Sequence, residues 1–127
     1  MRIKKVKIAI LGSTGSIGRT TLDILEKYKN KFQVNMLVCN KNKKIILEQI
    51  KKFLPKYVII SDINVFNYIK KINFRSKIKI FNSLKDFNEN CHIKFDKVIL
   101  GISSIYGLEY AFSFIKFSKE ILIAIMF

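Results

Sequence analysis

One segment near the N-terminus constrains the fold of this chain more than any other. Residues 6–11, VKIAIL, form a short apolar run rich in Ile and Val, which is typical of a buried strand. The run passes directly into the turn GSTGSIG, in which glycine recurs at Gly12, Gly15 and Gly18. Apolar residues at helical spacing follow over residues 16–29. The sequence therefore predicts a strand, a glycine-rich turn and a helix in immediate succession.

Glycine in such a turn has two physical uses. It adopts backbone angles that other residues avoid, and it lets a ligand approach the main chain closely. A helix that begins at Gly15 or Ser16 presents N–H groups and the positive end of its dipole at the turn, which are the properties of an anion site. The spacing is G-x-x-G-x-x-G, and no Gly-Lys-Ser/Thr follows, so a P-loop is excluded.

In an open α/β sheet, a turn of this kind holds the phosphates of a dinucleotide. The alternative is a tight turn that serves packing alone. We favour the dinucleotide, and the candidate binding residues in the turn are Gly12, Ser13, Thr14, Gly15, Ser16, Ile17 and Gly18.

The rest of the chain alternates strand-like and helix-like segments. Further strands are expected at 32–39, 57–60, 78–81, 97–100 and 121–125, and further helices at 43–53, 63–72, 83–88 and 108–117. Asp62 is expected to cap the helix that follows it, and Pro55 to follow the end of another. Strict alternation implies an α/β fold, a Rossmann-like doubly wound parallel sheet with helices on both faces. A length of 127 residues is that of one domain, so residues 1–127 are expected to form a single nucleotide-binding unit.

The end of the second predicted strand indicates which dinucleotide is bound. NAD-binding domains usually place Asp or Glu there, about 20 residues after the glycines, to bind the ribose 2′-hydroxyl. This chain has Asn40, Lys41 and Asn42 instead. A carboxylate would repel a 2′-phosphate, whereas Lys41 would attract it and the two amides could donate to it. The sequence therefore favours NADP over NAD.

The net charge of +15 raises the question of a polyanionic partner. The basic residues comprise 21 Lys and only 3 Arg, and Lys, Ile, Asn and Phe dominate the composition. Proteins that read nucleic acids rely on Arg for bidentate contacts. The charge therefore indicates the composition of an A+T-rich coding sequence, and nucleic acid is not the expected partner. A non-catalytic basic module that binds nucleotides or nucleic acids is the alternative function.

The remaining composition points to a reducing compartment. Cys39 and Cys91 have no metal-ligand spacing and are expected to be free, partly buried thiols. His92, the only histidine, is expected at the surface. The apolar run at residues 6–11 is too short for a signal peptide, and no segment is long enough to cross a membrane. A cytoplasmic protein without a membrane partner is expected.

Four segments carry a resemblance to a known family. They are ILGSTGSIGRTTLDIL, FQVNMLVCNKN, LEQIKKFLPKYVIISD and, more weakly, DKVILGISSIYGLEYAFSFIKFSKEILIA. Together they resemble the N-terminal, NADPH-binding domain of 1-deoxy-D-xylulose 5-phosphate reductoisomerase, an enzyme of isoprenoid precursor biosynthesis by the non-mevalonate pathway. The resemblance covers essentially the whole chain.

The resemblance implies an NADPH-dependent oxidoreductase/isomerase. Such an enzyme rearranges 1-deoxy-D-xylulose 5-phosphate and reduces it to 2-C-methyl-D-erythritol 4-phosphate. It further implies that Thr14, Gly15, Ser16 and Ile17 hold the pyrophosphate of the cofactor, and that residues 40–42 flank its ribose phosphate. A divalent metal (Mg or Mn) and the phosphosugar substrate are expected only in the full-length enzyme.

The chain departs from the family after the fifth predicted strand. Tyr110 and Ala111 stand where the family has Pro-Thr, and the bulky Tyr106 falls beside the expected nicotinamide site. The family reads A-N-K-E after its sixth strand, whereas this chain reads AIMF and ends at Phe127. Asp86 and Glu89 do not replace the missing metal-binding acids, so no catalytic or metal-ligating residue is predicted.

These departures lead to three expectations. The chain is expected to be inactive alone and to be a truncated or frameshifted product of a longer gene, with a genuine short protein as the alternative. A family-type homodimer is not expected of this chain by itself. The apolar segment 121–127 is expected to leave an uncovered sheet edge and to lower solubility. A stand-alone short-chain NADP-binding reductase is a disfavoured alternative, because no Tyr is followed by Lys four residues later.

Overall fold

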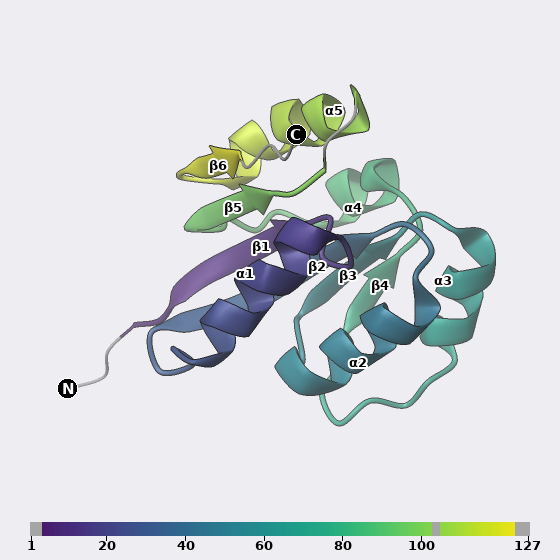
Figure 1. The fold of residues 1–127 in the computed structure, drawn as a ribbon. Helices are drawn as coiled ribbons and strands as arrows, with labels where there is room; N and C mark the ends of the chain where they lie inside the picture. The colour runs from purple at the N-terminus through teal and green to yellow at the C-terminus, as the bar shows by residue number, and fades with distance from the viewer. Residues whose placement is uncertain (1–3, 103–104, 124–127) are drawn as a thin grey trace.

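The computed structural model describes residues 4–102 and 105–123. Strands and helices alternate along them (Figure 1). The elements are β1 (Val6–Leu11), α1 (Ser16–Glu26), β2 (Phe32–Cys39), α2 (Lys43–Phe53), β3 (Tyr57–Ile60), α3 (Ile63–Lys70), β4 (Lys79–Phe81), α4 (Leu84–Asn90), β5 (Lys97–Leu100), α5 (Ile105–Phe114), a 3₁₀ turn (Ile115–Phe117) and β6 (Ile121–Ile123).

The strands form one six-stranded sheet in the order β4-β3-β2-β1-β5-β6, and every pairing is parallel. The chain builds the sheet outward from β1 to β4, then crosses back through α4 to place β5 on the other side of β1. This reversal is the topological switch point of a doubly wound sheet. Because all strands are parallel, their carboxyl ends and the loops that follow them meet at one edge.

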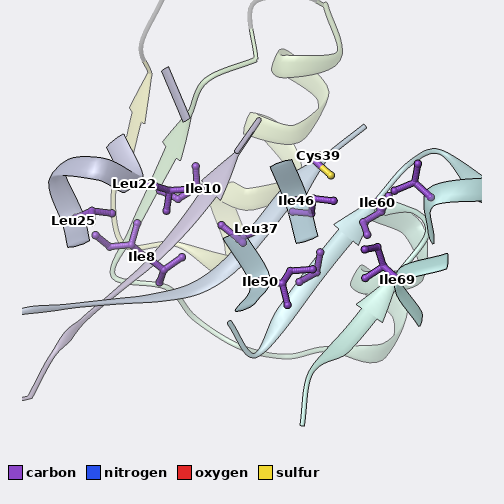
Figure 2. Close-up of a cluster of buried hydrophobic side chains, with 13 residues drawn as sticks. Ile8, Ile10, Leu22, Leu25, Leu37, Cys39, Ile46, Ile50, Ile60 and Ile69 are labelled. Carbon is purple, nitrogen blue, oxygen red and sulfur yellow. The ribbon is translucent and has the colours of Figure 1, made fainter. Parts of the chain in front are cut away.

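Helices cover both faces of the sheet, as the alternation predicts. On one face, α1, α2 and α3 pack Leu22, Ile46, Ile50 and other apolar side chains against the sheet. Figure 2 shows how these side chains meet Ile8 and the alternate residues of the strands. Each buried side chain of this size stabilises the fold by roughly 1.5–3 kcal/mol.

The other face is covered by α4, α5 and the 3₁₀ turn, and its core is aromatic. Phe87 of α4 lies 5.8 Å from Phe114 of α5 and 5.4 Å from Phe117, measured between ring centroids. Phe95 and Phe114 are fully buried. These rings hold α5 against β5, and so they place the start of α5 beside the carboxyl edge of the sheet.

β2 contains a bulge that the sequence pattern does not reveal. Ile8 of β1 pairs with Val34, but Ala9 pairs with Met36, so Asn35 is an extra residue in β2. Asn35 is fully buried, and its side-chain amide has no hydrogen-bond partner within the described residues. The bulge shifts the alternation of β2 by one residue, because Val34 faces the α1–α3 side and Met36 faces the α4–α5 side.

The predicted elements are all present, with changed ends. The first helix ends at Glu26 rather than at residue 29, and the last begins at Ile105 rather than at residue 108. In α1, Leu25 is buried, whereas its neighbour Ile24 is 52% exposed. Residues 124 and 125, expected in the last strand, lie outside the described residues.

Three predicted details are confirmed. Asp62 caps α3, since its Oδ1 accepts a hydrogen bond of 3.0 Å from the N–H of Val65. Both cysteines, Cys39 and Cys91, are free and buried. His92 lies at the surface, as expected.

Candidate cofactor site

The glycine-rich turn is tied to the end of β2. The N–H groups of Gly12 and Ser13 both donate to the carbonyl oxygen of Val38, at 2.8 and 2.9 Å. Gly12 adopts φ +84°, in the left-handed region where only glycine is unstrained. The turn therefore leaves β1 sharply while its first residues stay against β2, and α1 begins at Ser16 directly above the strand ends.

The three glycines of the motif serve different purposes. A Cβ atom on Gly12 would lie 3.1 Å from the backbone of Gly101, in addition to the strain of its positive φ. A Cβ atom on Gly18 would lie 2.6 Å from Cα of Ser13, closer than real contacts allow. At Gly15 the nearest atom would be 3.5 Å away, an ordinary contact, and φ is −79°. The protein itself therefore requires glycine at positions 12 and 18 but not at position 15.

Gly15 is also the N-cap of α1 and makes no side-chain capping bond. Ser, Asp or Asn would cap a helix better than glycine does. The glycine leaves the positive end of the α1 dipole open to an approaching anion, and no acidic residue lies in the first turn of α1.

A cavity of about 810 Å³ extends along the carboxyl edge of the sheet. Its lining comes from the loops after β1 to β5 and from α5, and comprises Gly12, Thr14, Gly15, Val38, Cys39, Asn40, Ser61, Asn82, Ser83, Leu84, Gly101, Ile102, Glu109 and Tyr110. Its volume falls within the range of ligand pockets. The cavity brings together the two predicted halves of the site, the glycine turn and the end of β2.

The loop after β2 carries the predicted ribose-phosphate residues. Asn40 lines the cavity, and its carbonyl oxygen accepts the N–H of Asp62 at 3.0 Å. Asn42 is the N-cap of α2, because its Oδ1 accepts from the N–H of Ile45 at 3.2 Å. Lys41 is exposed between them and forms no ion pair within the described part of the chain. The first turn of α2 holds no acidic residue, so this loop combines a cation with the positive end of a helix.

The seven candidate residues of the turn are not equivalent. Thr14 and Gly15 line the cavity, and Ser16 is exposed at the start of α1. Ser13 is fully buried, so only its backbone is available to the site. Ile17 packs beside Gly101, and Gly18 serves the packing of α1 on the turn. Lys41 and Asn42 do not line the cavity but directly follow Asn40, which does.

Several lining residues carry no sequence signal. Asn82 follows β4 and donates through Nδ2 to the carbonyl oxygens of Ile60 and Ser61, at 2.9 and 3.1 Å. Tyr110 of α5 lines the same end of the cavity, and burial raises the pKa of its phenol. Asn82 belongs to no motif, so only the strand order could have indicated it, and the sequence marks Tyr110 only as a departure from the family.

The departures at the start of α5 have different outcomes. Tyr110, which stands where the family has Pro, is a cavity residue. The side chain of Tyr106 lies outside what the structure describes, so its expected position beside the nicotinamide stays a prediction.

Burial raises the pKa of the Cys39 thiol to about 12, so this cavity residue is a neutral thiol at physiological pH.

Gln49 is a further residue near the site that the sequence analysis did not single out, although its position in the sequence is unusual. It lies on the apolar face of α2, three residues after Ile46 and four before Phe53, yet it is polar. Its side chain is only 7% exposed, and its Nε2 donates to the carbonyl oxygen of Ser13 at 2.8 Å. A buried amide at this position holds α2 to the glycine turn.

Metal and membrane features are not found in the described chain. Across residues 4–102 and 105–123, no three His, Cys, Asp or Glu side chains gather into a possible metal site. Asp86 and Glu89 are exposed on the short helix α4. None of the described helices has the length and apolar character needed to cross a bilayer.

Parallel strands in this order, a switch point beside β1 and a glycine turn at a helix N-terminus define a Rossmann-like dinucleotide-binding domain. The sequence profile of 1-deoxy-D-xylulose 5-phosphate reductoisomerase matches residues 8–125. The chain belongs to this family.

Individual relatives agree with the family assignment. The reductoisomerase of Pelagibacter ubique is 40% identical over 120 residues, which are 93% of this chain and 31% of that enzyme. The apicoplastic reductoisomerase of Plasmodium falciparum is 36% identical over 112 residues, 83% of this chain and 23% of that protein. The solved structure of the Zymomonas mobilis reductoisomerase in complex with NADPH superposes with a TM-score of 0.84 at 26% identity, covering 96% of this chain and 32% of that one. The chain thus spans between about a quarter and a third of the length of these relatives.

Proposed function

We propose that this chain is the NADPH-binding domain of a 1-deoxy-D-xylulose 5-phosphate reductoisomerase and that it binds the cofactor along the carboxyl edge of its sheet. In this proposal Thr14, Gly15, Ser16 and Ile17 hold the pyrophosphate, and the loop 40–42 holds the phosphate on the adenosine ribose. The structure of the Zymomonas mobilis relative with NADPH supports the choice of ligand.

The observation that carries the proposal is the glycine at position 15. Neither its backbone angles nor the space around its Cα requires glycine, because the nearest atom to a Cβ there would be 3.5 Å away. Serine would cap α1 better. A ligand that lies directly against the main chain explains the residue, since any side chain would occupy the position of the ligand.

The loop after β2 supports NADPH over NADH. No carboxylate stands at Asn40, Lys41 or Asn42, so no negative charge there repels a 2′-phosphate. Lys43, the first residue of α2, has its ammonium 4.1 Å from the centre of the Tyr68 ring, which leaves Lys41 as the better placed cation. The phosphate would lie between the Lys41 ammonium and the N-terminus of α2.

NADPH, when bound, supplies a hydride. The residues of this chain bind and orient the cofactor: the turn fixes the pyrophosphate, the loop after β2 fixes the adenosine, and Gly101 and Ile102 border the cavity beside β1. The described residues offer no group of three His, Cys, Asp or Glu side chains that could hold a divalent metal. We assign the rearrangement of the phosphosugar and its reduction to the complete enzyme, of which this chain matches about a third.

A cytoplasmic location is part of the proposal. Cys39 and Cys91 are both free and buried, which suits a reducing compartment.

Calorimetric titration of the 127-residue chain with NADPH and with NADH tests the proposal. We expect NADPH to bind at least tenfold more tightly than NADH, and the preference to shrink as salt screens the 2′-phosphate. Equal affinity for both cofactors would contradict the assignment of the loop 40–42. Binding of neither would contradict the proposed function.

A further inference from the structure

A side chain of the helix α2 forms a hydrogen bond with the backbone of the glycine turn. Gln49 of α2 donates from Nε2 to the carbonyl oxygen of Ser13 at 2.8 Å, across 36 residues of sequence. Both groups are buried: Gln49 is 7% exposed and Ser13 is fully buried. This hydrogen bond joins α2 to the backbone of the turn.

The bond controls the direction of the next N–H group. A trans peptide is planar, so its C=O and N–H point in opposite directions, and no peptide in the described chain is cis. With the carbonyl oxygen of Ser13 directed at α2, the N–H of Thr14 is directed away from α2. This N–H donates to no acceptor within the described residues, and Thr14 lines the cavity. The orientation of one peptide unit thus makes a main-chain donor available at the site.

The same helix also carries the other half of the site. Asn42 caps α2, and Gln49 lies seven residues later, two turns along the same face and about 10 Å along the helix axis. α2 therefore begins at the loop proposed for the ribose phosphate and contacts the turn proposed for the pyrophosphate.

Two further polar atoms are buried near the hydrogen bond between Gln49 and Ser13. Oε1 of Gln49 and the hydroxyl oxygen of Ser13 are both buried without a partner among the described residues. An apolar residue at position 49 would fill the face between Ile46 and Phe53 more simply. The amide of Gln49 is explained by the buried carbonyl oxygen of Ser13, which needs a hydrogen-bond donor.

We propose that Gln49 is a positioning residue for cofactor binding, which fixes the Ser13–Thr14 peptide so that the Thr14 N–H faces the pyrophosphate. The inference rests on the proposed function, because it assumes that the turn receives that group. Gln49 does not contact the cofactor; it acts through the carbonyl oxygen of Ser13.

Two ligands separate this role from a general contribution to stability. NADPH contains the pyrophosphate, whereas adenosine 2′-monophosphate contains only the adenosine and its 2′-phosphate. The Gln49→Met variant keeps the size of the side chain and loses the donor. We expect it to bind NADPH at least tenfold more weakly than the unchanged chain and adenosine 2′-monophosphate within twofold. Ile46→Val, on the same face of α2, is the matched control: it lowers Tm but changes both affinities less than twofold.

The outcomes are distinct. If the unchanged chain binds neither ligand, the proposed function fails. If it binds NADPH and Gln49→Met binds NADPH equally well, or loses affinity for both ligands in parallel, this inference fails alone.

NMR of the unchanged chain keeps the proposal testable should the Met variant not fold. In the ligand-free chain, the inference predicts a hydrogen-bond coupling between Nε2 of Gln49 and the Ser13 carbonyl, and a solvent-accessible Thr14 amide. Addition of NADPH should shift that amide and protect it from exchange. A Thr14 amide that NADPH leaves unchanged would overturn the inference.

Discussion

A Cβ atom on Gly18 would collide with the carbonyl oxygen of Gly12. The first turn of α1 therefore packs directly on the backbone of the turn that precedes it. Alanine is favoured over glycine in a helix by about 0.5–1 kcal/mol, but overpacking of this kind costs about 1–3 kcal/mol. We expect Gly18→Ala to lower the free energy of unfolding in urea by about 1–2 kcal/mol. An equal or higher stability would contradict the packing role.

Gly15→Ser should weaken cofactor binding without lowering the stability of the fold. Serine fits the extended backbone of the N-cap and caps a helix well, so stability should stay within about 0.5 kcal/mol or rise. The hydroxymethyl group would occupy the space proposed for the pyrophosphate, so NADPH affinity should fall at least tenfold. Calorimetry and urea unfolding on the same sample give both quantities. Unchanged NADPH affinity would remove the observation on which the proposed function rests.

Lys41→Ala tests the proposed site of the 2′-phosphate. NADPH affinity should fall about tenfold, NADH affinity should change less than twofold, and the salt dependence of NADPH binding should weaken, because one charge contact is lost. Lys27→Ala is the matched control, since Lys27 is exposed at the other end of α1. A similar loss for both cofactors would show that Lys41 does not discriminate between them.

Asp96 connects the ends of β1 and β6 and makes stability depend on pH. The backbone N–H of Lys7 donates to its Oδ2 at 2.8 Å, and the ammonium of Lys119 lies 3.2 Å from Oδ1. The backbone hydrogen bond from Lys7, and then Lys119, lower the pKa of Asp96 below its ordinary value of 3.8. The carboxylate therefore stabilises the fold fully above pH 3.8, and this stabilisation is lost as the pH falls through the lowered pKa.

The variant Asp96→Asn should lower the free energy of unfolding by about 1–2 kcal/mol at pH 7, because it replaces the charged acceptor of the Lys7 N–H with a neutral one and removes the ion pair with Lys119. The difference between the variant and the unchanged chain should shrink as the pH falls below 3.8 and through the lowered pKa of Asp96, because the carboxyl group of the unchanged chain then also becomes neutral. Urea unfolding of both proteins at pH 7 and at acidic pH measures this difference. Glu89→Gln, at an exposed position of α4, is the control. A difference that does not depend on pH would contradict the role of the charge.

The edge of the sheet at β6 accounts for the expected low solubility. β6 is the outermost strand next to β5, and Leu122 on it is 44% exposed. A lysine on an edge strand opposes pairing with another chain. Leu122→Lys should therefore raise the monodisperse fraction in light scattering, while Ile63→Lys, at an exposed position on α3, should not. A chain that is already a stable monodisperse monomer would contradict the expectation.

Local patterns were sufficient for the elements of the fold. Runs such as residues 6–11 and 57–60 are short and apolar, and the helices between them have apolar spacing, so parallel strands with crossover helices followed directly. The bulge at Asn35 could not be predicted, because it depends on how β2 pairs with β1 and leaves no mark in the run FQVNMLVC. The last helix was expected from residue 108, whereas α5 begins at Ile105.

The candidate site likewise contains residues that the sequence predicts and residues that it does not. The turn 12–18 and the loop 40–42 were predicted because each is a contiguous motif with a chemical meaning. Gln49, Asn82 and Tyr110 were not, since their roles arise from contacts across 21 or more residues of sequence. Gln49 had a visible signal, a polar residue on an apolar helix face, and such positions merit attention in other members of the family.

The most direct test of the account maps the cofactor onto the chain. Amide spectra of the ¹⁵N-labelled protein should be recorded during titration with NADPH. The largest shifts should fall in residues 12–18 and 40–42, with smaller shifts at Gly101 and Ile102. Shifts confined to the separate hollow between α1 and α2, around Arg19 and Lys52, or no shifts at all, would contradict it.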